Sequence, residues 1–430
     1  MHHPMMASHP PLAVMRLIAI AGGACALAAW SATCTEYDSS LLTYSHFSDA
    51  SAEDGSSPDA PTGDTALPDA LPDALPDAPP EADAGQDADT GTSTPCDPTC
   101  NDPSLARAPC PPAMPDPPDQ AQPLVFAMHS IRAGMSASAP NDWKTIGLDL
   151  DCLFTQSNGS PMQCKPLTST TSVVADGDQG RDNSFGNNLG GLIRLMEQFN
   201  LITTDVEQQW NDSLAKGGTG LLFEIDKFGG GTDDPQVLVS VLLSRGVYDP
   251  TGTTQLTANW DGNDYWAIDR DSVTPPQNQP KYVDDAAYVT ANRVVGHLPD
   301  GLPLKFVAGS GLLQVSLTNS VFILDLSQDH QHIVSGVISG VWYTSEAVSA
   351  LDAYAAQSGI CPDTPQYAAA RGALSKASDI RVDLKPAPTL DCNGMSIGMA
   401  FTAEPARLGA VVDPPIPNPS LCGDAGADAN

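Results

Sequence analysis

The chain has 430 residues and a formal net charge of -33, from 19 basic and 52 acidic side chains. This charge excludes binding to a nucleic-acid backbone or to an anionic membrane surface, because both need clustered Lys and Arg. Asp accounts for 44 of the acidic residues and Glu for 8, which favours turns, helix caps and metal-binding loops.

The first positive charge of the chain introduces an apolar segment. Arg16 precedes a run of small and aliphatic residues that ends in Ser31-Ala32-Thr33-Cys34. The segment is too short for a membrane span and has the form of a secretory signal. It resembles the signal of a Gram-negative lipoprotein, which implies that residues 1–34 are the signal, that Cys34 carries the lipid, and that the chain goes to the outer membrane. Ordinary secretion with removal of the whole segment is the alternative.

Residues 35–95 are acidic and rich in Pro and Ala. They contain 14 acidic and no basic side chains, and Leu-Pro-Asp-Ala occurs three times in succession at 67–78. Because like charges repel and little apolar surface can be buried, the sequence predicts a disordered tether. Its composition is similar to that of tethers in surface lipoproteins of some Gram-negative bacteria, which implies that the folded part stands off the outer membrane.

The remaining chain divides into three parts by composition. Residues 96–122 form a Pro- and Cys-rich linker, residues 123–409 carry regularly spaced apolar runs, and residues 410–430 return to a flexible tail. The middle part is long enough for one large domain or two closely packed ones.

The cysteine count fits an exported protein. Of ten cysteines, Cys25 lies in the signal and Cys34 is the predicted lipid site, which leaves an even number for disulfides in an oxidising compartment. We expect one local pair, Cys152 with Cys164, and a second pair, Cys361 with Cys392. The others would lock the termini: Cys96, Cys100, Cys110 and Cys422. A zinc site at Cys96 and Cys100 is the alternative, although no second pair stands at the required spacing.

Period-two alternation dominates the core. The expected strands are 124–131, 145–154, 219–228, 236–244, 288–298, 303–308, 312–317, 321–327, 333–342, 379–385 and 395–402. Helices are expected at 185–199, 204–217, 345–358 and 364–376, with a capping box at Thr204 and an N-cap at Thr364. The sequence therefore predicts a mainly β fold with helical insertions, an antiparallel β-sandwich-like core in one or two lobes.

One loop has the composition of a calcium site. Asp176, Asp178, Asp182 and Asn183 offer closely spaced oxygen ligands of the kind that Ca²⁺ takes from flexible loops. The spacing partly resembles an EF-hand loop, although Arg181 stands where that loop has a turn glycine. The alternative is that Asp182 or Asn183 only caps the following helix.

A second loop combines aromatic and acidic residues. Trp260, Asp261, Asp264 and Trp266 could bind a glycan, with rings that stack on the sugar and acids that take its hydroxyls. The alternative is a hairpin in which Asp261-Gly262 turns the chain and Trp266 fills the core.

Two pairs of carboxylates and one pair of histidines have spacings that could serve catalysis or metal binding. Asp149/Asp151 and Glu224/Asp226 each share a strand face, and a solvated outer face explains both pairs better than acid–base catalysis. His330 and His332 could bind a transition metal together, but a turn between strands explains them better.

No motif identifies an enzyme. The chain has no nucleophile elbow, zinc-protease helix, phosphate loop or dinucleotide fingerprint. We therefore expect a surface-anchored lipoprotein that acts as a non-enzymatic binding, adhesion or structural module, with a glycan or protein as ligand and Ca²⁺ as the possible cofactor. The alternative is an exported hydrolase of polysaccharide or ester, with candidate acids Asp261, Asp264, Glu224 and Asp226.

Overall fold

The computed structural model describes residues 100, 102–120, 122–136, 138–159, 161–167, 174–191, 193, 205–308, 311–414 and 419–422. The predicted signal with Cys34 and the predicted tether lie outside these residues. Within them, no helix is long and apolar enough to cross a membrane.

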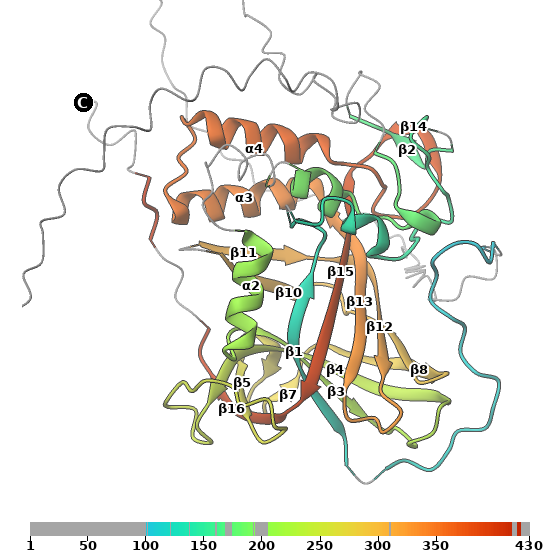
Figure 1. Ribbon diagram of the computed structural model, residues 1–430, viewed down its shortest axis with the longest axis vertical. Coiled ribbons are helices and arrows are strands. Elements are labelled where there is room, and N and C mark those ends of the chain that lie inside the picture. The colour runs from blue at the N-terminus through green and yellow to red at the C-terminus, as the bar shows by residue number, and fades with distance from the viewer. Residues whose placement is uncertain are drawn as a thin grey trace, which may run out of the picture. The chain divides into compact units, whose positions relative to one another are not determined.

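Eight antiparallel strands close into a barrel (Figure 1). These strands are β1 (Leu124–Arg132), β3 (Gly220–Asp226), β4 (Asp234–Tyr248), β8 (Val283–Thr290), β9 (Arg293–His297), β12 (Thr318–Leu326), β13 (Ile333–Tyr343) and β15 (Gly394–Pro405). Each pairs with the next member of the set, and the last, β15, pairs with the first, β1.

The barrel corrects the predicted sandwich, while the mainly β, antiparallel character is confirmed. The physical difference lies in β4. This strand of 15 residues pairs with β8 through its first part and with β5 (Tyr265–Asp269) through its last part. β4 thus pairs with two different strands along the same edge. The sheet therefore closes into a barrel and does not split into two stacked layers.

Aromatic rings fill the interior of the barrel. Phe223 stacks on Phe401 with ring centroids 5.3 Å apart, and Phe322 lies 6.1 Å from Phe223 on the other side. All three side chains are at most 3% exposed. A Cβ at Gly336 would overlap the ring of Phe401, and one at Gly296 would overlap that of Phe322, so glycine makes room for the rings.

Part of the outer surface is buried as well. Leu222 and Leu242 point away from the interior and join Trp266 of β5 in a second apolar cluster. The strand β16 (Arg407–Val412) pairs in parallel with β5 and borders the same cluster. This cover explains why β3 and β4 are apolar on both faces.

The long connections all leave the barrel at one end. Since neighbouring strands are antiparallel, the segments 133–219, 249–282, 298–317 and 344–393 emerge at the same rim. The opposite rim has only short connections, at 227–233, 291–292 and 327–332. We refer to the first end as the insertion rim.

The insertions carry the helices and the small sheets. The first holds η2 (Asp142–Thr145), β2 (Cys164–Lys165), η3 (Asp178–Gly180), η4 (Phe185–Leu189) and α2 (Val206–Ala215). The second holds β5, η5 (Arg270–Ser272), β6 (Val273–Thr274) and β7 (Gln279–Pro280), and the third holds the hairpin of β10 (Pro303–Ala308) and β11 (Gly311–Ser316). The fourth holds α3 (Thr344–Ser358), α4 (Pro365–Lys376) and β14 (Ala387–Asp391), with α3 and α4 side by side (Figure 1).

Most of the predicted helices form at the expected places. Thr364 caps α4 by accepting the N–H of Tyr367, and α3 ends at Gly359 in the left-handed region with φ of 71°. For α2 the cap is Asp205, which accepts the N–H of Gln208. The predicted cap Thr204, and most of the predicted helix after 191, lie outside the described residues.

Three predicted strands differ from the structure. Residues 288–298 turn at 291–292 and supply the end of β8 and all of β9. The segment 145–154 is irregular after η2, and 379–385 contributes one isolated bridge at Ile380. Both segments do bury their predicted apolar face, but they form no regular strand pairing. Their hydrogen bonds go to scattered partners, such as Ala106, the hydroxyl of Ser339 on β13 and Gly394 on β15.

The disulfide pairing also corrects the prediction. Cys152 pairs with Cys100, Cys164 pairs with Cys392, and Cys361 pairs with Cys422. Cys110 is disulfide-bonded as well. All four cysteines of the two predicted pairs are therefore bonded, but to other partners than predicted. Cys164 and Cys392 are brought together because the parallel pair β2–β14 aligns two insertions that are distant in sequence.

Candidate metal centre

Five aspartates gather at the insertion rim. Asp149, Asp151, Asp176 and Asp182 belong to the first insertion, and Asp379 follows α4 in the fourth. Backbone hydrogen bonds hold the first four together: the N–H of Asp182 donates to the carbonyl of Leu148, and that of Asp176 donates to Thr155. We call these five residues the carboxylate cluster.

Three members lie close enough to share one cation. Carboxylate oxygens of Asp149, Asp151 and Asp182 all lie within 4.8 Å of one another. Asp149 and Asp182 are each 3% exposed. The negative charges of Asp176 and Asp379 also act on Asp182 and Asp151.

Backbone and hydroxyl donors fix the carboxylates in position. Asp182 Oδ2 accepts the N–H of Leu150 at 2.6 Å, and Asp149 Oδ1 accepts that of Cys152 at 2.9 Å. Asp151 and Asp176 accept the N–H groups of Leu153 and Thr155. Asp379 accepts both the N–H and the hydroxyl of Ser396 on β15. A carboxylate has about four lone-pair sites, so these bonds leave capacity for a further ligand.

Burial makes the ionised form of these groups costly. It raises the pKa of Asp149 from 3.8 to about 6, although Arg107 opposes the shift, and it raises the pKa of Asp379 to about 7. Burial also raises the pKa values of Asp151, Asp176 and Asp182, and the neighbouring carboxylates add to the effect. Removing charge from water without a countercharge is unfavourable.

Within the part of the chain that the structure describes, Arg107 is the basic side chain that forms an ion pair with the cluster. Its guanidinium lies 3.5 Å from Asp149 Oδ2, and the backbone of its neighbour Ala106 is bonded to that of Asp149. The Cys100–Cys152 disulfide ties the same N-terminal segment to the loop. One guanidinium facing five carboxylates leaves an excess of negative charge if all of them ionise.

The predicted calcium residues divide between two roles. Asp176 and Asp182 belong to the cluster. Asp178 is exposed on η3, and Asn183 is buried with its Oδ1 accepting the N–H groups of Gly186 and Gly398. The Asn183–Gly186 bond is the capping contact of the alternative interpretation, so this loop both caps a helix and contributes to the cluster.

The sequence interpretation missed three members. Asp149 and Asp151 were expected on a solvated strand face; that prediction is wrong, because residues 102–110 and 176–182 cover the face. The alternation of Leu148 and Leu150 with the acids correctly predicted that the leucines are buried. It did not indicate that the acids are covered as well. Nothing in the local sequence around Asp379 marks it as a partner of residues some 200 positions earlier.

The predicted glycan loop is arranged differently. Trp266 is 1% exposed inside the second apolar cluster, and Asp264 is buried with its Oδ2 accepting the N–H groups of Asn259 and Trp260. The Trp260 indole donates to the carbonyl of Ala215, and Asp261 is exposed. Trp266 thus fills the core, as the alternative interpretation predicted. Since Trp266 and Asp264 are both buried, neither can contact a ligand at the surface.

The remaining chemical candidates are the acids of β3 and the two histidines. Glu224 and Asp226 lie on the outer side of β3, opposite the buried Phe223 and Ile225. Burial and the charge of Asp226 raise the pKa of Glu224. His330 Nε2 faces Asn292, whereas His332 Nδ1 contacts Glu404 at 2.5 Å. The two histidines therefore point to different partners.

The carboxylate cluster is a donor set made only of oxygen, which is the type that hard divalent cations prefer. Comparison of the chain with protein-family models, with curated proteins and with solved structures finds no match. The chemistry of the site is therefore argued from the residues of this chain.

Proposed function

We propose that this chain is an exported, lipid-anchored binding protein whose barrel domain holds Ca²⁺ at the carboxylate cluster. The observation that supports it best is the placement of Asp149, Asp151 and Asp182 with oxygens within 4.8 Å of one another, two of them almost fully buried. A divalent cation would neutralise charge that Arg107 alone does not.

Calcium suits the donor set better than other metals. Ca²⁺ takes six to eight oxygen ligands in flexible geometry, whereas transition metals favour imidazole or thiolate. The cysteines next to the cluster, Cys100 and Cys152, form a disulfide and offer no thiolate. Mg²⁺ keeps its waters and its octahedral geometry, so five carboxylates from loops fit it less well.

The binding role follows from the arrangement around the cluster. The cation would join the first and fourth insertions, and it would thereby hold the loops of the insertion rim in one conformation. Such a rim can present a surface to a glycan or a protein, as the lipoprotein-like signal and the tether lead us to expect. Of the acids named for a hydrolase, Glu224 and Asp226 lie side by side on the outer side of β3. Asp261 is exposed and Asp264 is buried, and none of the four lines the described pocket.

Calcium titration of the purified, EDTA-treated chain tests the site. We expect the wild type to bind Ca²⁺ in a calorimetric titration and to gain thermal stability from it. Asp182→Asn keeps an oxygen for the Leu150 N–H but removes the charge, and it should weaken binding about tenfold or more, the effect of losing a charged ligand worth at least 1.4 kcal/mol. An unchanged thermal midpoint in excess Ca²⁺ would refute the site.

Asp178→Asn is the matched control. Asp178 lies in the same loop, yet its side chain is exposed and outside the cluster, so this variant should bind Ca²⁺ like the wild type. Equal losses in both variants would mean that the loop responds to its total charge and holds no defined site.

The anchor is tested separately. Intact-mass analysis of the mature protein should find an N-terminal Cys34 with attached lipid, and Cys34→Ser should abolish that mass. An unmodified mature N-terminus would rule out the anchor and leave the cation site untouched.

A further inference from the structure

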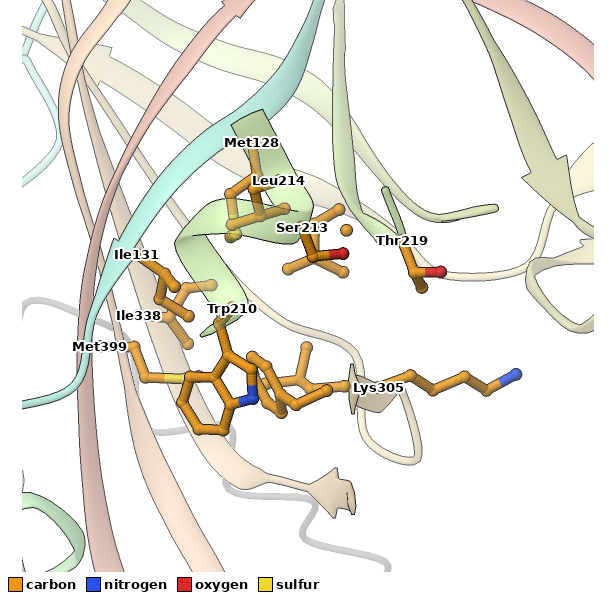
Figure 2. Close-up of a pocket in the computed structure, with 13 residues that line it drawn as sticks. Met128, Ile131, Trp210, Ser213, Leu214, Thr219, Lys305, Ile338 and Met399 are labelled. Carbon is orange, nitrogen blue, oxygen red and sulfur yellow. The ribbon is translucent and has the colours of Figure 1, made fainter. Parts of the chain in front are cut away.

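A pocket lies between α2, β10 and the barrel strands next to them (Figure 2). Barrel strands contribute Met128, Ile338 and Met399, α2 contributes Trp210, and β10 contributes Phe306. The empty space of about 550 Å³ includes the part open to solvent, so the enclosed part is much smaller and only a small molecule would enter it.

Hydrogen bonds to β1 and to the residues that follow it fix the wall of the pocket. Glu207 Oε2 on α2 accepts the N–H groups of Ala133 at 2.9 Å and Met135 at 3.1 Å. Asn211, one turn further, accepts the N–H of Ile131 and donates to its carbonyl. Because these bonds tie α2 to the backbone of β1 and of the residues after it, the position of Trp210 does not depend on a ligand.

Trp210 brings an unpaired donor into this apolar site. The residue is 5% exposed, and its Nε1 is buried without a hydrogen-bond partner among the residues that the structure describes. The indole nitrogen lies on the side of the ring turned away from Met399 (Figure 2). A buried unpaired donor costs about 1–3 kcal/mol, and a ligand with an acceptor oxygen would recover part of that cost.

The charges around the pocket favour a neutral ligand. The aliphatic part of the Lys305 side chain lines the pocket, and its amino group extends away from the indole of Trp210 (Figure 2). That amino group contacts Asp269 at 3.2 Å and Asp271 at 3.0 Å. Lys305 is thus already neutralised, and an anionic ligand would find no free countercharge in the described lining.

We propose that this pocket binds a neutral, mostly apolar small molecule whose carbonyl oxygen accepts a hydrogen bond from Trp210 Nε1. The rings of Trp210 and Phe306, with centroids 4.8 Å apart, and the flexible methionine side chains suit a flat or aromatic body. The proposal is independent of the cation site, since no member of the carboxylate cluster lines the pocket.

Two probes isolate the hydrogen bond. Acetophenone and ethylbenzene have the same ring and the same two-carbon chain, and only acetophenone has a carbonyl oxygen. Each probe is titrated into the purified chain up to about 1 mM, so that dissociation constants up to about 1 mM can be measured. Binding is followed by the NMR signals of the indole N–H groups. Ethylbenzene is the more hydrophobic probe, so burial alone would favour it.

We expect acetophenone to bind about five- to tenfold more tightly than ethylbenzene, the worth of one hydrogen bond to a buried donor. It should also move the Trp210 indole signal downfield, which ethylbenzene should not do. Trp210→Phe keeps the ring in the pocket without the donor and should lose the preference. Trp266→Phe removes another buried indole donor outside the pocket and should retain it.

The outcomes that would overturn the proposal are distinct. Failure of both probes to bind would mean that the space admits only water. Equal binding of the two probes would mean that the Trp210 indole does not donate a hydrogen bond to the ligand. A preference for acetophenone that persists in Trp210→Phe would mean the same.

Discussion

The barrel interior and the carboxylate cluster are built in opposite ways. The interior is closed by apolar side chains such as Phe223, Phe322 and Phe401, which come from strands of one continuous ring. The cluster assembles five acids from two loop insertions, and hydrogen bonds hold it while its charges repel. The interior is thus stable by its own composition, whereas the cluster needs protons or a cation.

The largest effect should come from the interior. Phe223→Ala removes a fully buried ring and should lower the free energy of unfolding by about 3–5 kcal/mol, measured by chemical denaturation. Leu256→Ala, at a residue that is 48% exposed, is the control and should change it by less than about 0.5 kcal/mol. If Phe223→Ala has an equally small effect, the aromatic stack does not contribute to the stability of the barrel.

Calcium should stabilise the protein through the cluster alone. At free Ca²⁺ of about 100 times the dissociation constant, the free energy of unfolding should rise by about 2.7 kcal/mol. Because the interior and the cluster share no side chain, Phe223→Ala should gain the same increment. A much smaller gain in this variant would mean that the two regions are coupled, and the comparison above would fail.

The metal-free protein should lose stability as the pH rises. The pKa values of Asp149 and Asp379, about 6 and about 7, exceed the value of 3.8 for an unperturbed Asp. The folded state therefore holds these protons more tightly, and the stabilisation is lost as the pH rises through about 6 and 7. The thermal midpoint without Ca²⁺ should thus be lower at about pH 8 than at about pH 5.

Saturating Ca²⁺ should reverse this trend, because it binds the ionised carboxylates. Thermal scans with EDTA and with Ca²⁺ at both pH values provide the measurement. Identical pH profiles in the two series would argue that the cation binds elsewhere.

The smallest effect should come from the cap of α4, at the end of the helix opposite to Asp379. Thr364→Ala removes the acceptor for the Tyr367 N–H and should lower stability by about 1 kcal/mol while leaving Ca²⁺ affinity unchanged. Ser349→Ala, at an exposed mid-helix residue of α3, is the control and should be nearly neutral. A loss of Ca²⁺ affinity in Thr364→Ala would show that α4 positions Asp379.

Local patterns predicted the parts of the fold that local forces decide. The alternation around Phe223 and Ile225 identified β3 and its buried face, and Thr364-Pro365 marked the start of α4. Closure of the barrel was not predictable in this way, because it depends on pairing of β1 with β15, at opposite ends of the domain. A sandwich and a barrel present the same alternation along each strand.

The cluster shows the same limit at the level of single residues. Asp176 and Asp182 were found because they stand close together in one Asp-rich loop. Asp149 and Asp151 alternate with buried leucines, which is the pattern of a solvated face unless another segment covers it. That cover comes from residues 102–110 and 176–182, and its presence is a property of the folded topology.

The Cys164–Cys392 bond, which joins two insertions across 228 positions, bears on how the protein matures. If the chain is exported as proposed, it emerges from its N-terminus, so Cys164 would meet an oxidising environment long before its partner arrives. Cys100 and Cys152 would meanwhile be within reach of it, and early non-native pairs would form quickly with these nearer thiols. Reaching the native pairing would then require exchange of those bonds, the reaction that a disulfide isomerase catalyses.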